Sequence, residues 1–229
     1  MVKRPYLSPA LFYLQDFNQY HVLAMPASEM GNLTLVGRNT AGKTTLANCF
    51  YPMLIDGSIA TPSFNAAKGT EKLDQSTTVR NSKQDARTFE KMLLGFGPGA
   101  KKIRTGYACL LMKSDTRQVL FGIGAHRATD GTHGKTWWFV VIEPETDAVI
   151  SLITTDADWR SLEKTAFIEQ NAALGDRLRV FSRADEYRTY VADAVYGFDN
   201  EELLGKLANT YRLLASPILT GGAARFQPI

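Results

Sequence analysis

The clearest chemical signal is a glycine-rich stretch that fits the pattern GxxxxGK[ST] at every constrained position: Gly37-Arg38-Asn39-Thr40-Ala41-Gly42-Lys43-Thr44. In such a loop the glycines let the backbone curl, so that successive N–H groups face phosphate oxygens. A helix that follows the loop directs its positive end at the same charge. The pattern therefore predicts a site for the phosphates of a nucleotide.

Each residue of this loop has an expected role. Lys43 is the predicted catalytic cation, bridging the β- and γ-phosphates, and the Thr44 hydroxyl is the predicted Mg²⁺ ligand. Thr45 is placed to donate to the α-phosphate from the first turn of the helix. The predicted nucleotide-binding set is Gly37, Arg38, Asn39, Thr40, Ala41, Gly42, Lys43, Thr44 and Thr45.

The elements around this loop are predicted from apolar spacing. Residues 10–25 alternate as a β-hairpin with a polar turn, and residues 32–36 form a short strand rich in branched side chains. Apolar positions at helical spacing follow over residues 46–54. The order strand, glycine loop, helix is the setting that the phosphate-binding pattern requires. Residues 56–82 are polar and predict an extended segment.

The rest of the chain divides into a β-rich and a helical part. A short helix is predicted over residues 84–94 and is ended by the glycines and proline of residues 95–99. Strands at 103–112, 118–124 and 135–142 predict an antiparallel meander. Helices at 156–170, 183–195 and 200–214 follow, each preceded by Asp, Ser or Asn as an N-cap candidate.

Residues Gly31 to Leu46 read GNLTLVGRNTAGKTTL and resemble the glycine-rich opening of SMC-like and RecF-like ATPases. Asn39 occupies the family's asparagine position, whereas Thr40 stands where the family commonly has glycine. Similarity to N-terminal head halves of MukB-like proteins, including the Wadjet and Mks defence subunits, extends through Phe64-Asn65 and through the strand that begins Arg104-Thr105-Gly106-Tyr107.

The resemblance implies an α/β fold, with an ABC- or SMC-type P-loop NTPase core, an antiparallel β lobe and a helical C-terminal portion. Residues 1–229 are then one N-terminal head half: residues 1–55 hold the hairpin, P-loop strand and helix, 56–102 the polar loop and short helix, 103–155 the β lobe, and 156–229 the helical portion. The implied function is that of a DNA-associated motor ATPase in DNA loop extrusion, chromosome organisation or defence against plasmids.

The resemblance also implies ligands and partners. ATP and Mg²⁺ are the implied cofactors, and a second head in a homodimer, kleisin-type subunits and DNA are the implied partners. The implied location is the bacterial cytoplasm, in association with the nucleoid. No membrane partner is expected, because no stretch approaches about 18 consecutive apolar residues.

Two elements of a complete head lack convincing candidates. Trp138 to Glu143 has the apolar run and terminal acid of a Walker B strand, but Pro144 follows, and we interpret it as an ordinary antiparallel strand. Leu219-Thr220-Gly221-Gly222 is similar to a signature loop, but it lies too near the end of the chain for the helix and strand that should follow. We therefore expect hydrolysis only with a C-terminal head half and a second head.

Basic residues form two clusters for which we weighed contact with DNA: Lys101, Lys102 and Arg104, and then Arg80, Lys83 and Arg87. A solvated rim is the favoured interpretation of both. Trp137 and Trp138 are interpreted as packing residues.

Composition is that of an ordinary globular protein, with 45% hydrophobic and 21% charged residues in 229, and a net charge of +3. Two separated cysteines, Cys49 and Cys109, suggest neither a disulfide framework nor a thiolate metal site. The histidines lack companions at metal-ligand spacing.

Other functions stay open from the sequence. The chain could be a self-contained P-loop kinase for a nucleotide or small metabolite, with Glu143 or Asp115 completing its metal site. It could also be an interaction domain that keeps the loop as a scaffold. A GTPase is disfavoured, because the nearest approach to a base-reading NKxD tetrad, residues 81–85, is displaced by one position and lies too early in the chain.

Overall fold

A computed structural model describes residues 6–29, 31–38, 43–50, 57, 89–95, 97–128, 136–144 and 150–214. The chain divides into two compact units. Unit 1 comprises residues 1–36 and 93–183, and unit 2 comprises residues 37–92 and 184–229. Each unit therefore combines two stretches that are distant in sequence.

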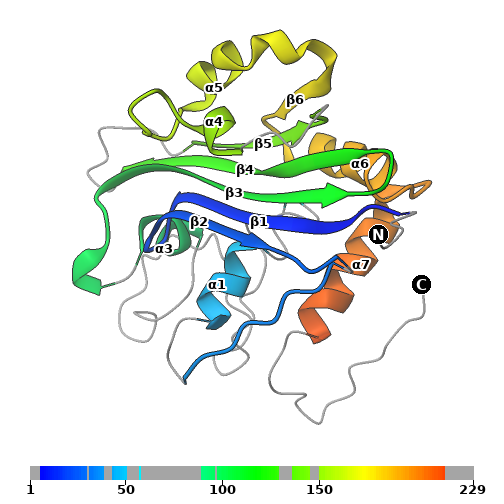
Figure 1. Cartoon of the computed structure of the whole chain (residues 1–229), viewed down its shortest axis with the longest axis horizontal. Helices are drawn as coiled ribbons and strands as arrows, with labels where there is room; N and C mark the ends of the chain where they lie inside the picture. Colours follow the sequence, from blue (N-terminus) through cyan, green and yellow to red (C-terminus); the bar gives the residue numbers. More distant parts are fainter. Residues whose placement is uncertain are drawn as a thin grey trace. The chain divides into compact units, whose positions relative to one another are not determined.

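Unit 1 is built on a six-stranded antiparallel sheet with the strand order β2-β1-β3-β4-β5-β6 (Figure 1). The strands are β1 (Ser8–Phe17), β2 (Tyr20–Pro26), β3 (Ile103–Lys113), β4 (Gln118–Ala128), β5 (Thr136–Ile142) and β6 (Leu178–Phe181). The predicted hairpin and the predicted meander are both confirmed. They form one sheet, because β1 pairs antiparallel with β3.

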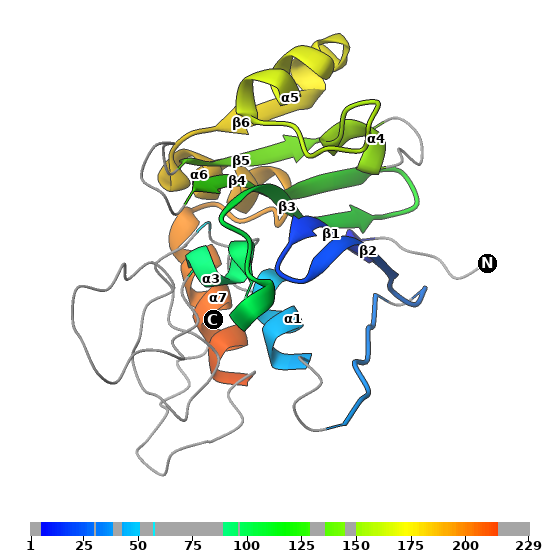
Figure 2. The same cartoon turned by 90° about the vertical axis from the view of Figure 1, so that its left-hand side faces the viewer.

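Three described helical segments of unit 1 follow β5. They are α4 (Ile150–Thr154), α5 (Lys164–Gln170) and the 3₁₀ segment η3 (Ala172–Arg177), and Figures 1 and 2 show α4 and α5 on the β5 and β6 side of the sheet. A short helix α3 (Phe89–Leu94) and the 3₁₀ turn η2 (Gly97–Gly99) precede β3. The described part of the helix predicted at 84–94 is thus helical and ends at the glycine-rich turn, as expected.

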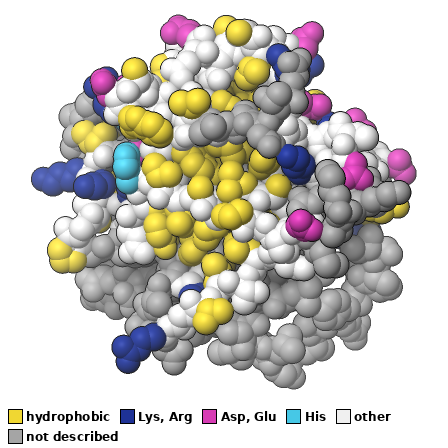
Figure 3. Space-filling model, in the orientation of Figure 1, with side chains coloured by type: hydrophobic (Ala, Val, Ile, Leu, Met, Phe, Trp, Pro, Cys, Tyr) yellow, Lys and Arg dark blue, Asp and Glu magenta, His cyan; other side chains and the backbone are white. Residues whose placement is uncertain are grey.

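Alternating residues of the strands build the core of unit 1. One face of the sheet carries Tyr107, Leu120 and Trp138, which pack with Leu162 and with Phe167 of α5. Trp138 is fully buried and meets Tyr107 edge to face, with ring centroids 5.7 Å apart. The packing role predicted for Trp138 is therefore confirmed. In Figure 3 hydrophobic side chains gather over the middle of the face shown, and charged side chains lie toward its margins.

Residues 32–36 do not form the predicted strand. After β2 the chain turns at Ser28, where the Ser28 N–H donates to the Asn32 carbonyl at 2.9 Å, and residues 32–38 then lie outside any helix or strand. Leu33 and Val36 are 36% and 91% exposed. A strand needs a neighbour for its backbone N–H and C=O groups, and the described sheet pairs none of its strands with this segment.

The region predicted as helical from residue 156 onward begins differently. A helix covers only Lys164–Gln170 of the predicted 156–170 range. The Asp156 carboxylate accepts the N–H groups of Asp158 and Arg160, both at 2.9 Å, and Trp159 has a φ of +62°. These local bonds offer the backbone an alternative to a helix.

Strand β6 is a second departure from the predicted helical portion. It pairs with β5, with Val180 opposite Val140, and Leu178 and Val180 pack on the core. No helix was predicted over residues 178–181, and partial burial of Leu178 and Val180 favours a strand there, because strand preference depends strongly on packing.

Unit 2 holds α1 (Lys43–Phe50), α6 (Ala184–Ala194) and α7 (Glu201–Leu214). The helices predicted at 183–195 and 200–214 are confirmed within one residue at each end. The Leu203 N–H donates to the Asn200 side-chain oxygen at 3.2 Å, as expected for an N-cap. Among the described helices, none has the length and apolar character needed to cross a membrane.

Candidate functional site

The glycine-rich loop leads into helix α1, whose first residue is Lys43. The Lys43 ammonium group donates to the carbonyl oxygens of Gly37 and Arg38, at 2.6 and 2.8 Å. The side chain therefore folds back over the start of the loop that precedes it. This brings a positive charge to the place where the motif predicts the phosphates.

The first turn of α1 adds to the positive character of this place. It contains no acidic residue, and the exposed N–H groups of a helix start carry partial positive charge. The opposite end of the helix is anchored, because Leu46, Cys49 and Phe50 are buried. Burial raises the pKa of the Cys49 thiol, which favours its neutral form in this packed position.

Part of the predicted nucleotide site lies outside the described residues. This applies to Asn39, Thr40, Ala41 and Gly42, and also to the side chains of Thr44 and Thr45. The expected roles of these residues remain predictions. Gly37, Arg38 and Lys43 are the members of the set that the structure brings together.

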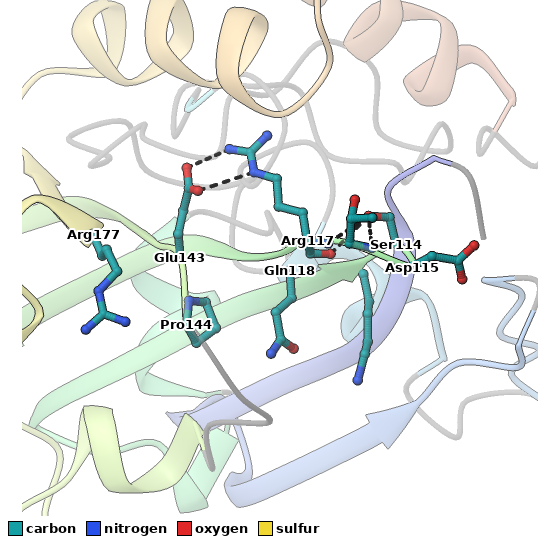
Figure 4. Close-up of a pocket in the computed structure, with 9 residues that line it drawn as sticks. Ser114, Asp115, Arg117, Gln118, Glu143, Pro144 and Arg177 are labelled. Atoms are coloured by element: carbon teal, nitrogen blue, oxygen red, sulfur yellow. Dashed lines mark hydrogen bonds and ion pairs between the residues drawn. The ribbon is translucent and has the colours of Figure 1, made fainter. Parts of the chain in front are cut away.

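Glu143 and Asp115, the candidate metal ligands of the kinase alternative, line one pocket of unit 1 (Figure 4). Glu143 is paired with Arg117, and two of the three guanidinium nitrogens lie 2.6 and 3.3 Å from the Glu143 carboxylate oxygens. A carboxylate held in this way has an arginine where a metal ion would bind. Glu143 also follows a strand that is antiparallel to both of its neighbours, which agrees with our interpretation of residues 138–142 as an ordinary strand.

A polar cluster that the sequence did not reveal surrounds Asp16. Its carboxylate accepts the Ser161 hydroxyl at 2.6 Å and the Gln15 amide at 3.2 Å, and lies 2.6 Å from a ring nitrogen of His21. Burial acts to raise the pKa of Asp16, but the hydrogen bonds from Ser161, His21 and Gln15 outweigh burial and lower it. Tyr13 adds a hydrogen bond to Gln15 at 2.6 Å.

This cluster contains Ser, His and Asp but is not arranged for nucleophilic catalysis. A serine nucleophile needs the histidine beside it as a base, with the carboxylate behind the histidine. Here the carboxylate lies between the other two, and the serine proton points at Asp16. The cluster therefore joins the β1–β2 turn to the chain that follows α4.

Arg104, one of the candidates for contact with DNA, stabilises the same β1–β2 turn. Its guanidinium donates to the carbonyl oxygens of Asn18, Leu93 and Tyr20. Lys101 and Lys102 of the same cluster are exposed, whereas Arg80, Lys83 and Arg87 lie outside the described residues. Arg104 is thus a structural residue, since both of its terminal guanidinium nitrogens donate to backbone carbonyls.

A search against models of known protein families found no match, and no curated protein matched the chain.

Proposed function

We propose that this chain is the ATP-binding N-terminal half of an SMC-like head, part of a DNA-associated motor ATPase. The observation that carries the proposal is the position of the Lys43 ammonium, 2.6 and 2.8 Å from the first two carbonyl oxygens of a loop with the sequence GxxxxGK[ST]. Such a loop presents a fixed cation and a helix start to an incoming triphosphate. ATP with Mg²⁺ is the proposed ligand.

The segment before the loop, which pairs with none of the described strands, supports the idea of half a head. Residues 32–36 have the branched composition of a buried strand, yet Val36 is 91% exposed and no described strand pairs with them. A central strand needs partners on both edges. In the proposed assembly a C-terminal half supplies those partners, together with the Walker B and signature elements.

The proposal also states what the isolated chain should do. In the SMC-like mechanism two heads enclose ATP, and hydrolysis requires groups from both. The chain by itself should therefore bind nucleotide and hydrolyse it slowly. DNA, a kleisin-type subunit and a second head are the proposed partners, and compaction of DNA or defence against plasmids is the proposed role.

The direct test is calorimetric titration of ATP and Mg²⁺ into the Lys43→Ala variant. Removal of a hydrogen-bonded charge should weaken binding by at least about tenfold, since such contacts contribute roughly 1.5–3 kcal/mol. Lys206→Ala, at an exposed lysine of α7, is the matched control and should bind as the parent does. Equal affinity in Lys43→Ala and Lys206→Ala would contradict the proposal.

A second measurement separates the motor from a self-contained kinase. The purified chain is incubated with ATP, Mg²⁺ and a set of nucleoside and sugar acceptors. The proposal expects no phosphorylated acceptor, and expects ATP turnover to rise only when a C-terminal head half is added. Rapid transfer of phosphate by the chain alone would favour the kinase.

A further inference from the structure

Strand β2 (Tyr20–Pro26) forms one outer edge of the sheet of unit 1, and Figure 1 shows β1 as its neighbouring strand. Among the described strands, β2 pairs with β1 alone. An edge strand presents a row of backbone N–H and C=O groups that another strand can bind. The outer side of β2 is therefore a surface on which a further strand can pair.

Two residues of β2 direct their backbone groups outward, away from β1. The Ala27 N–H donates to the Ala10 carbonyl at 2.9 Å, and the register of the two strands then continues without a shift from Pro26 to Val22. In an antiparallel pair, residues that exchange hydrogen bonds with the neighbouring strand alternate with residues whose N–H and C=O groups point the other way. Val22 and Ala24 lie at odd spacings from Ala27, so their N–H and C=O groups point outward. Pro26 also lies at an odd spacing, where its lack of an N–H costs no bond to β1.

The side chains of the same two residues are apolar and open to a partner. Val22 is 44% exposed, Ala24 is exposed, and residues two apart on a strand point to the same face. Strand β2 contains no Asp, Glu, Lys or Arg, and its His21 lies 2.6 Å from the Asp16 carboxylate. Strand β2 thus has no lysine or carboxylate of its own that would keep another strand away.

The opposite edge of the sheet is protected. Strand β6 has only four residues, Leu178–Phe181, and Arg179 within it is exposed. Short length and an exposed charge are two devices by which proteins prevent edge strands from pairing. Strand β2 has seven residues and neither device.

We propose that β2 pairs antiparallel with β2 of a second copy of this chain, about a two-fold axis at Leu23. Val22 and Ala24 lie on either side of Leu23, so that each Val22 faces Ala24 of the other copy. Their outward N–H and C=O groups then exchange hydrogen bonds in both directions, as a self-complementary interface requires. The side chains that meet are small and uncharged, so no like charges oppose the pairing.

The strand suits a second copy of itself better than it selects a different protein. It carries no charge that would attract an oppositely charged partner, whereas its outward groups have the spacing that two-fold pairing needs. One strand pair buries less than the roughly 1,200–2,000 Å² of stable complexes, so the dimer should be weak and depend on concentration. The surface belongs to unit 1 and does not depend on the proposed ATPase function.

Sedimentation equilibrium of the chain without nucleotide tests the pairing. All proteins carry Lys43→Ala, so that the glycine-rich loop does not bring two chains together around ATP. The chain with Lys43→Ala alone should change from monomer to dimer as its concentration rises from about 1 μM to about 1 mM, the range of weak association.

Two charge variants test the register. Val22→Lys combined with Ala24→Lys places lysines opposite each other across the axis and should weaken dimerisation by at least about tenfold. Val22→Glu combined with Ala24→Glu should have the same effect. An equimolar mixture of the two variants should dimerise again, because each lysine then faces a glutamate.

Leu152→Lys combined with Ile168→Lys is the matched control. It adds the same two charges at exposed positions of α4 and α5 and should dimerise as the chain with Lys43→Ala alone does. Circular dichroism confirms that each variant is folded.

Several results would overturn the proposal. One is a chain that stays monomeric at about 1 mM, which would leave the edge of β2 to a different protein. Others are dimerisation that survives in the lysine variant, an equal loss in the control, and a mixture of folded lysine and glutamate variants that stays monomeric.

Discussion

At the scale of single residues, hydrogen-bond geometry separates the groups that can do chemistry from those that hold the fold. Lys43 contacts two loop carbonyls at the start of a helix, where a charged ligand can join it. Asp16 and Arg104 are equally polar, but their partners are a serine hydroxyl, a histidine and backbone carbonyls of the β1–β2 turn. The first arrangement predicts binding and the second predicts stability.

Asp16→Asn tests the structural role of the carboxylate. Asn tolerates the positive φ of residue 16 (+46°), so the change mainly removes charge. Because Asp16 has a lowered pKa in the folded protein, its ionised form stabilises the fold fully above its ordinary value of 3.8. This stabilisation is lost as the pH falls through the lower, folded-state pKa. The variant should lose about 1 kcal/mol at neutral pH.

The measurement is urea unfolding of Asp16→Asn and of the parent between pH 7 and pH 3. The gap between the two proteins should close as the pH falls below about 4, since the parent's carboxylate then becomes protonated. Glu169→Gln, at an exposed position of α5, is the control and should differ little from the parent throughout. A gap that stays constant down to pH 3 would show that the charge of Asp16 does not stabilise the turn.

At the scale of elements, close approach within the sheet decides which side chains fit. A Cβ atom at Gly124 would lie 2.4 Å from the Trp138 indole, which is fully buried. Gly124 and Trp138 are direct partners in the β4–β5 ladder. The lack of a side chain at Gly124 of β4 therefore leaves room for Trp138, the largest side chain of the unit 1 core.

Gly124→Ala should accordingly destabilise the protein by about 1–3 kcal/mol, the usual cost of an overpacked core. Gly205→Ala is the informative comparison, because no atom lies within 4 Å of a Cβ at that position of α7. There the same substitution should stabilise by roughly 0.5–1 kcal/mol, since alanine suits a helix interior better than glycine. Thermal unfolding measures both, and effects of the same sign would contradict this account of the sheet.

At the scale of the whole molecule, the glycine-rich loop and the pocket at the β3–β4 turn belong to different units. The glycine-rich loop and α1 are in unit 2, whereas the pocket of Lys113 and Arg177 is in unit 1. Stability is rarely uniform across a structure. A ligand makes local unfolding less frequent in the part of the protein to which it binds. A nucleotide bound at the glycine-rich loop should therefore protect unit 2 more than the sheet of unit 1.

Hydrogen exchange can show this division. ATP with Mg²⁺ at about 100 times its dissociation constant should raise the free energy of unfolding by roughly 2.7 kcal/mol. Exchange of the α1 amides, residues 43–50, should slow, whereas strands β3 to β5 should change little. The effect should vanish in Lys43→Ala. Protection confined to the sheet of unit 1, with α1 unaffected, would place the nucleotide elsewhere.

Elements with a strong local signal were predictable from the sequence. Alternating apolar residues identified the hairpin and the meander, and the Asn200 cap marked the start of α7. The pattern GxxxxGK[ST] likewise located Lys43 at the beginning of a helix, because its chemistry depends on neighbours only a few residues away. These features depend on short-range interactions.

Only the tertiary structure decided the rest. It joined β1 to β3, added β6 to the sheet and paired residues 32–36 with none of the described strands. It also brought Ser161 to Asp16 across 145 positions and Arg177 to the pocket of Lys113. The physical reason is that strand pairing and side-chain clusters depend on which surfaces can be buried together, and that choice is made between segments far apart in the chain.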